Sequence, residues 1–215
     1  MRPGAGLPGS FNRTAQPTHQ PCMPRRVVKP YRLEFEFERN PLKPAEERRL
    51  FKVALKGAHK EVEEWRRAQT DEERFYAAPR AAVAAFNFGE YELARELARQ
   101  SLALAESFQG NWNYGNALHL GHTVLGLLAL RSGNAALAAK ELQMSGQTPG
   151  SPQLGSFGPT MQLAKAMLKT GAAEPVLAYF RQCHEFWRMG GDWLDVWERK
   201  VRRGGVPNFV MHSYR

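Results

Sequence analysis

The chain has 215 residues, of which 43% are hydrophobic, and this length suits one domain with a buried core. Its net charge is +9 at pH 7, and its two cysteines are too few for a disulfide framework. No apolar run approaches the roughly 18 residues of a membrane span, and prolines and glycines interrupt the apolar stretch that a secretory signal needs. These features argue against a membrane protein and a disulfide-stapled protein, and we expect a cytoplasmic location.

The first part of the chain does not have the composition of a folded domain. Residues 1–30 are rich in proline and poor in aliphatic side chains, which predicts a flexible tail. Residues 31–43 form a separate segment, in which apolar and charged residues alternate with the period of a strand; the apolar positions are Tyr31, Leu33, Phe35 and Phe37. Because no second strand is evident, we expect this segment to pack in an extended form against helices, or to add to a partner's sheet.

A helical domain is expected over residues 44–205. Its first helix should begin near Pro44 and present one apolar face, made of Phe51, Ala54, Leu55, Ala58, Val62 and Trp65. Thr70 and Glu73 have the spacing of a capping box that opens the next helix. Pro79 should kink or restart that helix, because proline donates no hydrogen bond and clashes with the preceding turn.

The remaining apolar periodicity predicts further helices to the end of this domain. They are expected over residues 80–88, 90–107, 115–131, 134–145, 158–170 and 174–189. A last helix over residues 193–203 has the pattern of a cap that covers the apolar side of the final hairpin. Residues 206–215 are then expected to be a C-terminal tail.

A helical-hairpin signature recurs three times in this domain. The pattern is a small residue where two helices cross, a glycine at the turn and a small residue on the second helix, as in tetratricopeptide repeats. The three copies are Ala82, Gly89 and Ala94; Gly126, Gly133 and Ala138; and Ala164, Gly171 and Val176. Their glycines lie 44 and 38 residues apart, against roughly 34 in a regular repeat, so longer loops must separate the hairpins. The pattern predicts an all-α, tetratricopeptide-like fold, and the alternative is an ordinary helical bundle.

A glycine- and proline-rich loop at residues 148–159, TPGSPQLGSFGP, lies between the second and third copies. With this loop, residues 112–187 resemble a widespread bacterial family of tetratricopeptide-like proteins. The resemblance implies a helical-repeat fold and a bacterial origin, and it implies no catalytic residue, because the family has no established reaction. Family members usually carry Asn at the position of Gly155 and a polar residue such as Asn at that of Thr160, so a ligand held by those amides would be bound differently here.

Few residues have the spacing of a chemical site. His119 and His122 are three residues apart and could begin a metal site, but no further ligand stands at a recognisable distance from them. A metal-assisted hydrolase around these histidines is therefore only a third alternative, and we predict no metal, no cofactor and no catalytic residue. Cys183 and His184 are adjacent on a helix and point in different directions, so we expect Cys183 to fill the core.

A binding surface is the remaining candidate, since the first helix of each hairpin lines the concave side of a repeat array. The partner-binding residues that we predict are Trp112, Asn113, Tyr114, Asn116, His119 and Thr123, with Leu154 and Phe157 from the loop. Asn113 and Asn116 are also suited to cap a helix. The predicted function is a non-catalytic scaffold that binds a peptide or partner protein in a concave groove, with no role at membranes.

The alternative function is association with RNA or DNA through the basic ends of the chain. Residues 1–40 carry a net charge of +4, residues 41–190 carry +3 and residues 191–215 carry +2. The densest cluster, and the candidate nucleic-acid site, is Arg199, Lys200, Arg202 and Arg203. The same cations also suit the C-terminal end of a helix, and dispersed basic residues often only solvate a surface.

Overall fold

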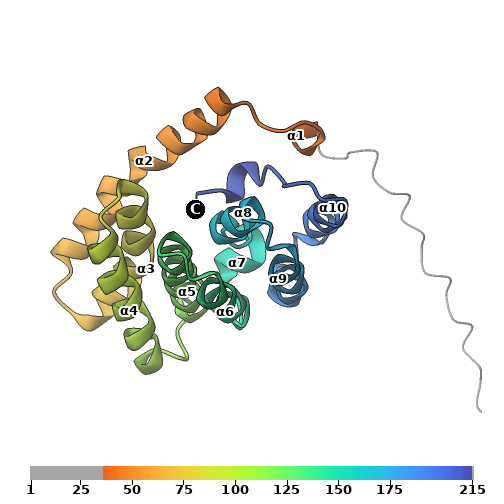
Figure 1. Cartoon of the computed structure of the whole chain (residues 1–215). Helices are drawn as coiled ribbons and strands as arrows, with labels where there is room; N and C mark the ends of the chain where they lie inside the picture. The colour runs from red at the N-terminus through yellow and green to blue at the C-terminus, as the bar shows by residue number, and fades with distance from the viewer. Residues whose placement is uncertain (1–35, 215) are drawn as a thin grey trace, which may run out of the picture. The chain divides into compact units, whose positions relative to one another are not determined.

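A computed structural model describes residues 36–214, and the regular structure in this range is all helical (Figure 1). The described residues form ten α-helices and one 3-10 turn, without a strand. The helices are α1 (Glu36–Arg39), α2 (Pro44–Arg67), α3 (Asp71–Phe88), α4 (Tyr91–Ser107), α5 (Tyr114–Arg131), α6 (Ala135–Gly146), α7 (Pro152–Phe157), α8 (Gln162–Lys169), α9 (Ala173–Phe186) and α10 (Gly191–Arg202), and the 3-10 turn is η1 (Val210–His212). The predicted all-α class is confirmed, whereas the predicted tail at residues 1–30 lies outside the described range.

The start of α3 follows the predicted capping box. The Thr70 hydroxyl accepts a hydrogen bond from the Glu73 N–H at 3.2 Å, and the Glu73 carboxylate accepts from the N–H groups of Gln69 at 2.6 Å and Thr70 at 3.1 Å. The bonds from Gln69 and then Thr70 hold the pKa of Glu73 below its ordinary value. The side chains of Thr70 and Glu73 thus bond backbone N–H groups at the start of α3 that have no partner within the helix.

Pro79 does not restart the helix, because α3 runs from Asp71 to Phe88 as one element with this proline inside it. Proline has no N–H, so the carbonyl of Phe75, four residues earlier, loses its usual partner. In this structure the side-chain amide of Asn113 donates to that carbonyl at 3.4 Å. A residue at the start of α5 therefore compensates for the proline in α3.

The three turn glycines lie where the hairpin pattern places them. Gly89, Gly133 and Gly171 have φ angles of 84°, 82° and 87°, the left-handed conformation that glycine adopts after a helix. They join α3 to α4, α5 to α6 and α8 to α9. The glycines thus serve as predicted at the turns of three helix pairs.

The predicted crossing positions are buried at close contacts between helices. A Cβ atom on Gly126 of α5 would collide with the side chain of Leu163 on α8 and lie 3.1 Å from the Cβ of Glu141 on α6. The other small crossing residues are also buried; these are Ala82, Ala94, Ala138 and Ala164. Small side chains let the helix backbones approach, as the sequence pattern predicted.

Successive helices follow one another along a curved row from α2 to α10 (Figure 1). One core cluster joins α2, α3, α4 and α5, and a second joins α5, α6, α8, α9 and α10. Helix α5 contributes to both clusters, through residues such as Val124 and Leu127. Among the described helices, none has both the length and the apolar composition needed to cross a lipid bilayer.

The segment predicted to be extended contains a helical turn, α1, at Glu36–Arg39, while residues 31–35 lie outside the described range. The reason is the carboxylate of Glu38, which is buried, whereas the alternating pattern of a strand predicts an exposed charge at this position. Glu38 accepts hydrogen bonds from the indole N–H of Trp197 at 3.1 Å, the amine of Lys200 at 3.2 Å, and the backbone N–H groups of Asn208 at 2.7 Å and Phe209 at 3.0 Å. These bonds fix α1 to α10 and to the C-terminal segment.

Residues 206–214, which the sequence predicted as part of a C-terminal tail, pack on the helices, and most of them are buried. The side-chain amide of Asn208 donates to the backbone carbonyls of Phe37 and Asn40, and its oxygen accepts from the N–H of Leu42. Phe209 is fully buried, with its ring centroid 4.8 Å from that of Trp197. The end of the chain therefore completes the core beside α10.

Candidate functional site

A cleft of about 510 Å³ lies between α2 and α3 on one side and α5 and α7 on the other. The wall from α2 is made of Ala54, Gly57, Ala58 and Glu61, which share one helix face. Because three of these side chains are small or absent, the helix leaves space beside it. Tyr214, near the end of the chain, also lines the cleft and packs on Phe51 of α2 with ring centroids 5.3 Å apart.

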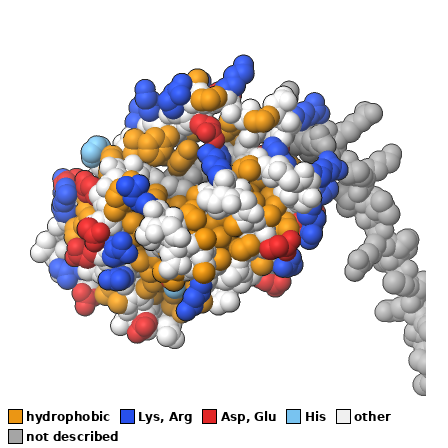
Figure 2. Space-filling view, viewed as in Figure 1, with side chains coloured by type: hydrophobic (Ala, Val, Ile, Leu, Met, Phe, Trp, Pro, Cys, Tyr) orange, Lys and Arg blue, Asp and Glu red, His pale blue; other side chains and the backbone are white. Residues whose placement is uncertain are grey.

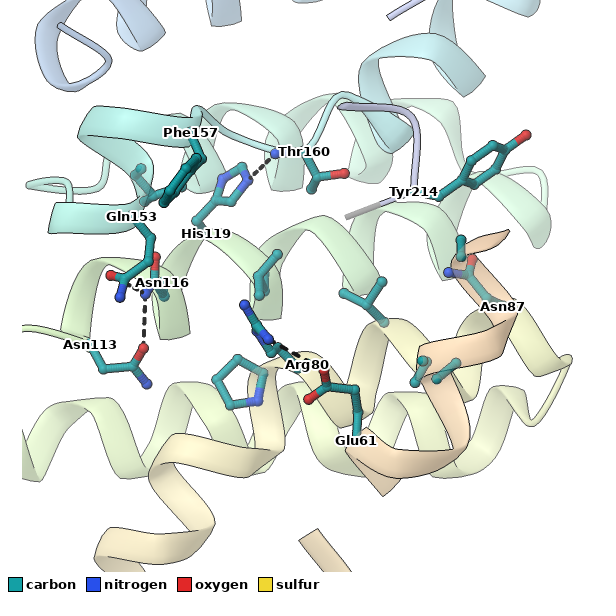
Figure 3. Close-up of a pocket in the computed structure, with 18 of the residues that line it drawn as sticks. Glu61, Arg80, Asn87, Asn113, Asn116, His119, Gln153, Phe157, Thr160 and Tyr214 are labelled. Atoms are coloured by element: carbon teal, nitrogen blue, oxygen red, sulfur yellow. Dashed lines mark hydrogen bonds and ion pairs between the residues drawn. The ribbon is translucent and has the colours of Figure 1, made fainter. Parts of the chain in front are cut away.

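An ion pair stands on one wall of the cleft. The Arg80 guanidinium on α3 lies 3.3 Å from the Glu61 carboxylate on α2, and the Arg80 side chain is 67% exposed. Figure 3 shows this pair facing the amides of Asn116 and Gln153 on the opposite wall. The Glu61 side chain is 25% exposed, so the guanidinium of Arg80 is the part of this pair that a ligand can reach most readily.

The opposite wall is held by a network of amides. The Asn116 nitrogen donates to the oxygens of Asn113 at 2.9 Å and Gln153 at 3.3 Å, and the Ser151 hydroxyl donates to the Asn116 oxygen at 2.7 Å. The network ties the start of α5 to α7, so both predicted asparagines serve the fold as well as lining the cleft. Within the described range no hydrogen bond uses the amide nitrogen of Gln153, which remains a donor for a ligand.

His119 lies on the same wall but is fully buried. Its Nδ1 lies 3.1 Å from the carbonyl oxygen of Ser145, to which it donates, and its Nε2 accepts from the N–H of Thr160 at 3.1 Å. This arrangement fixes the neutral tautomer, and burial lowers the pKa of His119 to about 4. Since both nitrogens are engaged within the protein, the histidine orients the loop before α8, and its contact with a partner stays a prediction.

The glycine- and proline-rich loop contains the short helix α7. Its Ser151 caps the helix by accepting from the N–H of Leu154 at 3.0 Å, and Gly158 ends it at a position where a Cβ would collide with the ring of Trp187. Leu154 is buried, whereas Phe157 is 63% exposed and lines the cleft. The two predicted anchors therefore divide into one that holds the loop and one that a ligand can reach.

The other predicted residues lie elsewhere. Trp112 and Tyr114 line a second pocket of about 600 Å³, together with the loop and Met189. Thr123 is buried and lines neither pocket. The eight candidates thus separate into five at the cleft, two at the second pocket and one in the core.

Several residues of the cleft were not predicted. Arg80 and Tyr76 come from α3 and Gly57 from α2, two helices in which the sequence predicted no binding residue. The small residues at positions 54, 57 and 58 could have indicated the cleft. A helix face with small side chains can border a cavity as well as pack closely on a neighbour. Tyr214 had no such signal, since its place depends on the return of the chain's end.

The geometry does not assemble the metal site of the third alternative. The ring nitrogen Nδ1 of His122 lies 2.7 Å from the carboxylate of Glu141, while His119 faces other partners. Over residues 36–214, no three side chains of the ligand-forming types gather at one point. Cys183 is buried, as predicted, and burial raises the pKa of its thiol.

The basic cluster on α10 is partly neutralised. Lys200 bonds to the buried Glu38 at 3.2 Å, and Arg202 pairs with Glu198 at 2.6 Å. Arg199 and Arg203 remain exposed. Two of the four predicted nucleic-acid contacts are therefore engaged within the fold.

The chain matches no family model, no curated protein and no solved structure in comparisons with each. Its function is therefore inferred from the cleft and the surface. Apolar side chains gather in the middle of the face shown in Figure 2, over the region of α5 and α7.

Proposed function

We propose that this domain binds a peptide segment of a partner protein in the cleft between α2, α3, α5 and α7, without catalysing a reaction. The observation that carries the proposal is a cleft of about 510 Å³ in which apolar and polar side chains from four helices converge. Sites of this size, mostly apolar with a few placed polar groups, are typical of ligand binding.

The arrangement of helices around the cleft supports a tetratricopeptide-like array. We assign its three repeats to the pairs α3/α4, α5/α6 and α8/α9, whose turn glycines are all left-handed. Residues of α3 and α5 line the cleft, whereas α4 and α6 contribute none. First helices line the concave surface of such arrays, and this surface is where they bind extended peptides.

The lining suits a peptide better than a purely apolar ligand. Leu120 and Phe157 offer surface to apolar side chains. The amide of Gln153 can donate to a backbone carbonyl, and the pair of Arg80 and Glu61 can exchange partners with charged groups of the ligand. An extended chain presents all three kinds of group along its length.

A pair of substitutions at Gly57 tests this proposal. Nothing lies within 4 Å of a Cβ added there, and the position faces the cleft between Ala54, Ala58 and Glu61. Gly57→Phe should fill the cleft without disturbing the fold, whereas Gly57→Ala should leave it open and add helix propensity. We expect wild type and Gly57→Ala to select peptides from a displayed random library, and Gly57→Phe to lose at least tenfold in affinity for them.

The salt dependence of peptide capture gives a second readout. Binding anchored by apolar side chains should change little between low and high salt, while binding by dispersed charge should fall steeply. If Gly57→Phe binds the selected peptides as wild type does, or if no peptide is selected at either salt concentration, the cleft does not have this function.

A further inference from the structure

The outer face of α2 carries a row of cations. Arg48, Arg49, Lys52 and Lys56 are all exposed. The helical period places them on the side opposite the residues that line the cleft, and Figure 2 shows Lys and Arg side chains gathered over α2. Arg48, Lys52 and Lys56 are four residues apart, which is about 6 Å along the axis for each step.

These cations are not neutralised by neighbouring acids. Elsewhere on the surface, basic side chains such as Lys60, Arg66 and Arg74 form ion pairs with acids three or four residues away. In the described part of the chain, Arg48, Arg49, Lys52 and Lys56 form none.

The nearest acids on α2 are turned to other partners. Glu47 lies 3.1 Å from the amine of Lys165 and 3.7 Å from that of Lys169 on α8, and the bond with Lys165 is the main cause that holds the pKa of Glu47 below its ordinary value. Glu46 accepts from the backbone N–H of Lys43 at 2.7 Å. The outer face therefore keeps an uncompensated positive charge.

We propose that this face of α2 binds the phosphate backbone of a nucleic acid. A phosphate backbone needs only an accessible row of cations, because the binding energy comes from released counterions and no apolar pocket is required. The site is distinct from the cleft, which lies on the inner side of the same helix, and from the cluster on α10 whose cations are partly paired.

Two other anionic partners fit the surface less well. A helix that lies in a membrane must insert its apolar face, but Ala58 and Val62 of α2 are buried in the core with α3. The centre of a protein interface is usually apolar. The described residues of α2 expose a single large apolar side chain, that of Val53, which is too little for such a centre. The cationic row alone suits phosphates.

The test measures binding of the full chain to a 20-base-pair DNA duplex and to a 20-nucleotide single strand by fluorescence anisotropy. With four phosphate contacts, the logarithm of the duplex binding constant should fall with the logarithm of salt concentration with a slope of about −4. Arg48→Gln/Arg49→Gln should reduce that slope by about two and weaken binding at least tenfold at low salt. The matched control is Arg199→Gln/Arg203→Gln, which removes the same charge from α10 and the residue after it and should change the slope little.

Three results would overturn the proposal. The first is that neither nucleic acid binds at low salt. The second is that the α10 variant loses as much affinity as the α2 variant. The third is that the chain binds vesicles containing phosphatidylserine through α2 but binds neither nucleic acid. Circular dichroism verifies the fold of each variant. All four exchanged side chains are exposed, and in the described part of the chain they form no ion pair.

Discussion

His119 is the residue on which the loop before α8 depends. Its two ring nitrogens join the end of α6, through Ser145, to Thr160, and they can do so only when the ring is neutral. Thr160 is in turn bound by Tyr179, whose hydroxyl donates to its carbonyl at 3.2 Å. Protonation of His119 would therefore break the buried hydrogen bond between α5 and the loop before α8.

Stability should depend on pH through this histidine. Its pKa is about 4 in the fold and near 6.5 in the unfolded chain, so the unfolded chain binds the proton more readily between these values. The stabilisation is complete above pH 6.5 and is lost as the pH falls towards 4, by roughly 3 kcal/mol. Urea unfolding at pH 7 and pH 4 should show this loss in wild type and a smaller one in His119→Gln. Equal losses in the two proteins would refute the assignment.

The carboxylate of Glu38 should be among the most sensitive positions in the chain. In Glu38→Gln, one of the two oxygens that accept N–H groups becomes an NH₂ group, which is itself a donor and faces other donors. We expect the free energy of unfolding to fall by about 3 kcal/mol. The exposed Glu64, which pairs with Lys60, serves as control, and Glu64→Gln should change stability by less than about 0.5 kcal/mol. Denaturant melts that do not separate the two variants would contradict the buried role of Glu38.

At the scale of helices, Gly126 tests the crossing of α5 with α6 and α8. Gly126→Leu would force a side chain into the space of Leu163, and we expect a loss of about 3 kcal/mol or failure to fold. Gly57→Ala, in the open face of α2, should instead raise stability by about 1 kcal/mol. Thermal melts of both variants compare a packed glycine with an unpacked one, and a fully stable Gly126→Leu would count against the crossing.

Local sequence signals predicted the helices well. The capping box at Thr70 and the turn glycines Gly89, Gly133 and Gly171 interact with residues close to them in the sequence. They can therefore be recognised without knowledge of the fold. The role of Glu38 was not predictable in this way, because its partners are about 160 to 170 residues away in the chain.

The cleft was predicted only in part for the same reason. The sequence placed polar residues on the wall formed by α5, which holds Asn116, because repeat periodicity identifies first helices. It could not show that Arg80 of α3 and Gly57 of α2 form the facing wall, since this depends on how helices from separate hairpins lie in space. His119 has the type and position of a binding residue, but long-range hydrogen bonds engage it within the fold.

At the scale of the whole described unit, the two ends of the helical row are joined by the chain itself. Glu38 and Asn208 tie α1 to α10 and to the C-terminal segment, and Tyr214 from that segment reaches the cleft beside α2. The inner side of α2 thus borders a proposed peptide site, while its outer side carries a proposed phosphate-binding face. A single helix separates two surfaces of different chemistry.

The proposed function requires that the cleft, and not another surface, receives the peptide. Photocrosslinking from two exposed positions tests it, with p-benzoylphenylalanine placed at Phe157 in the cleft or at Met189 in the second pocket, which are 63% and 73% exposed. We predict that a library-selected peptide crosslinks from position 157 and not from position 189. Crosslinking from position 189 alone, or equally from both positions, would contradict peptide binding in the cleft.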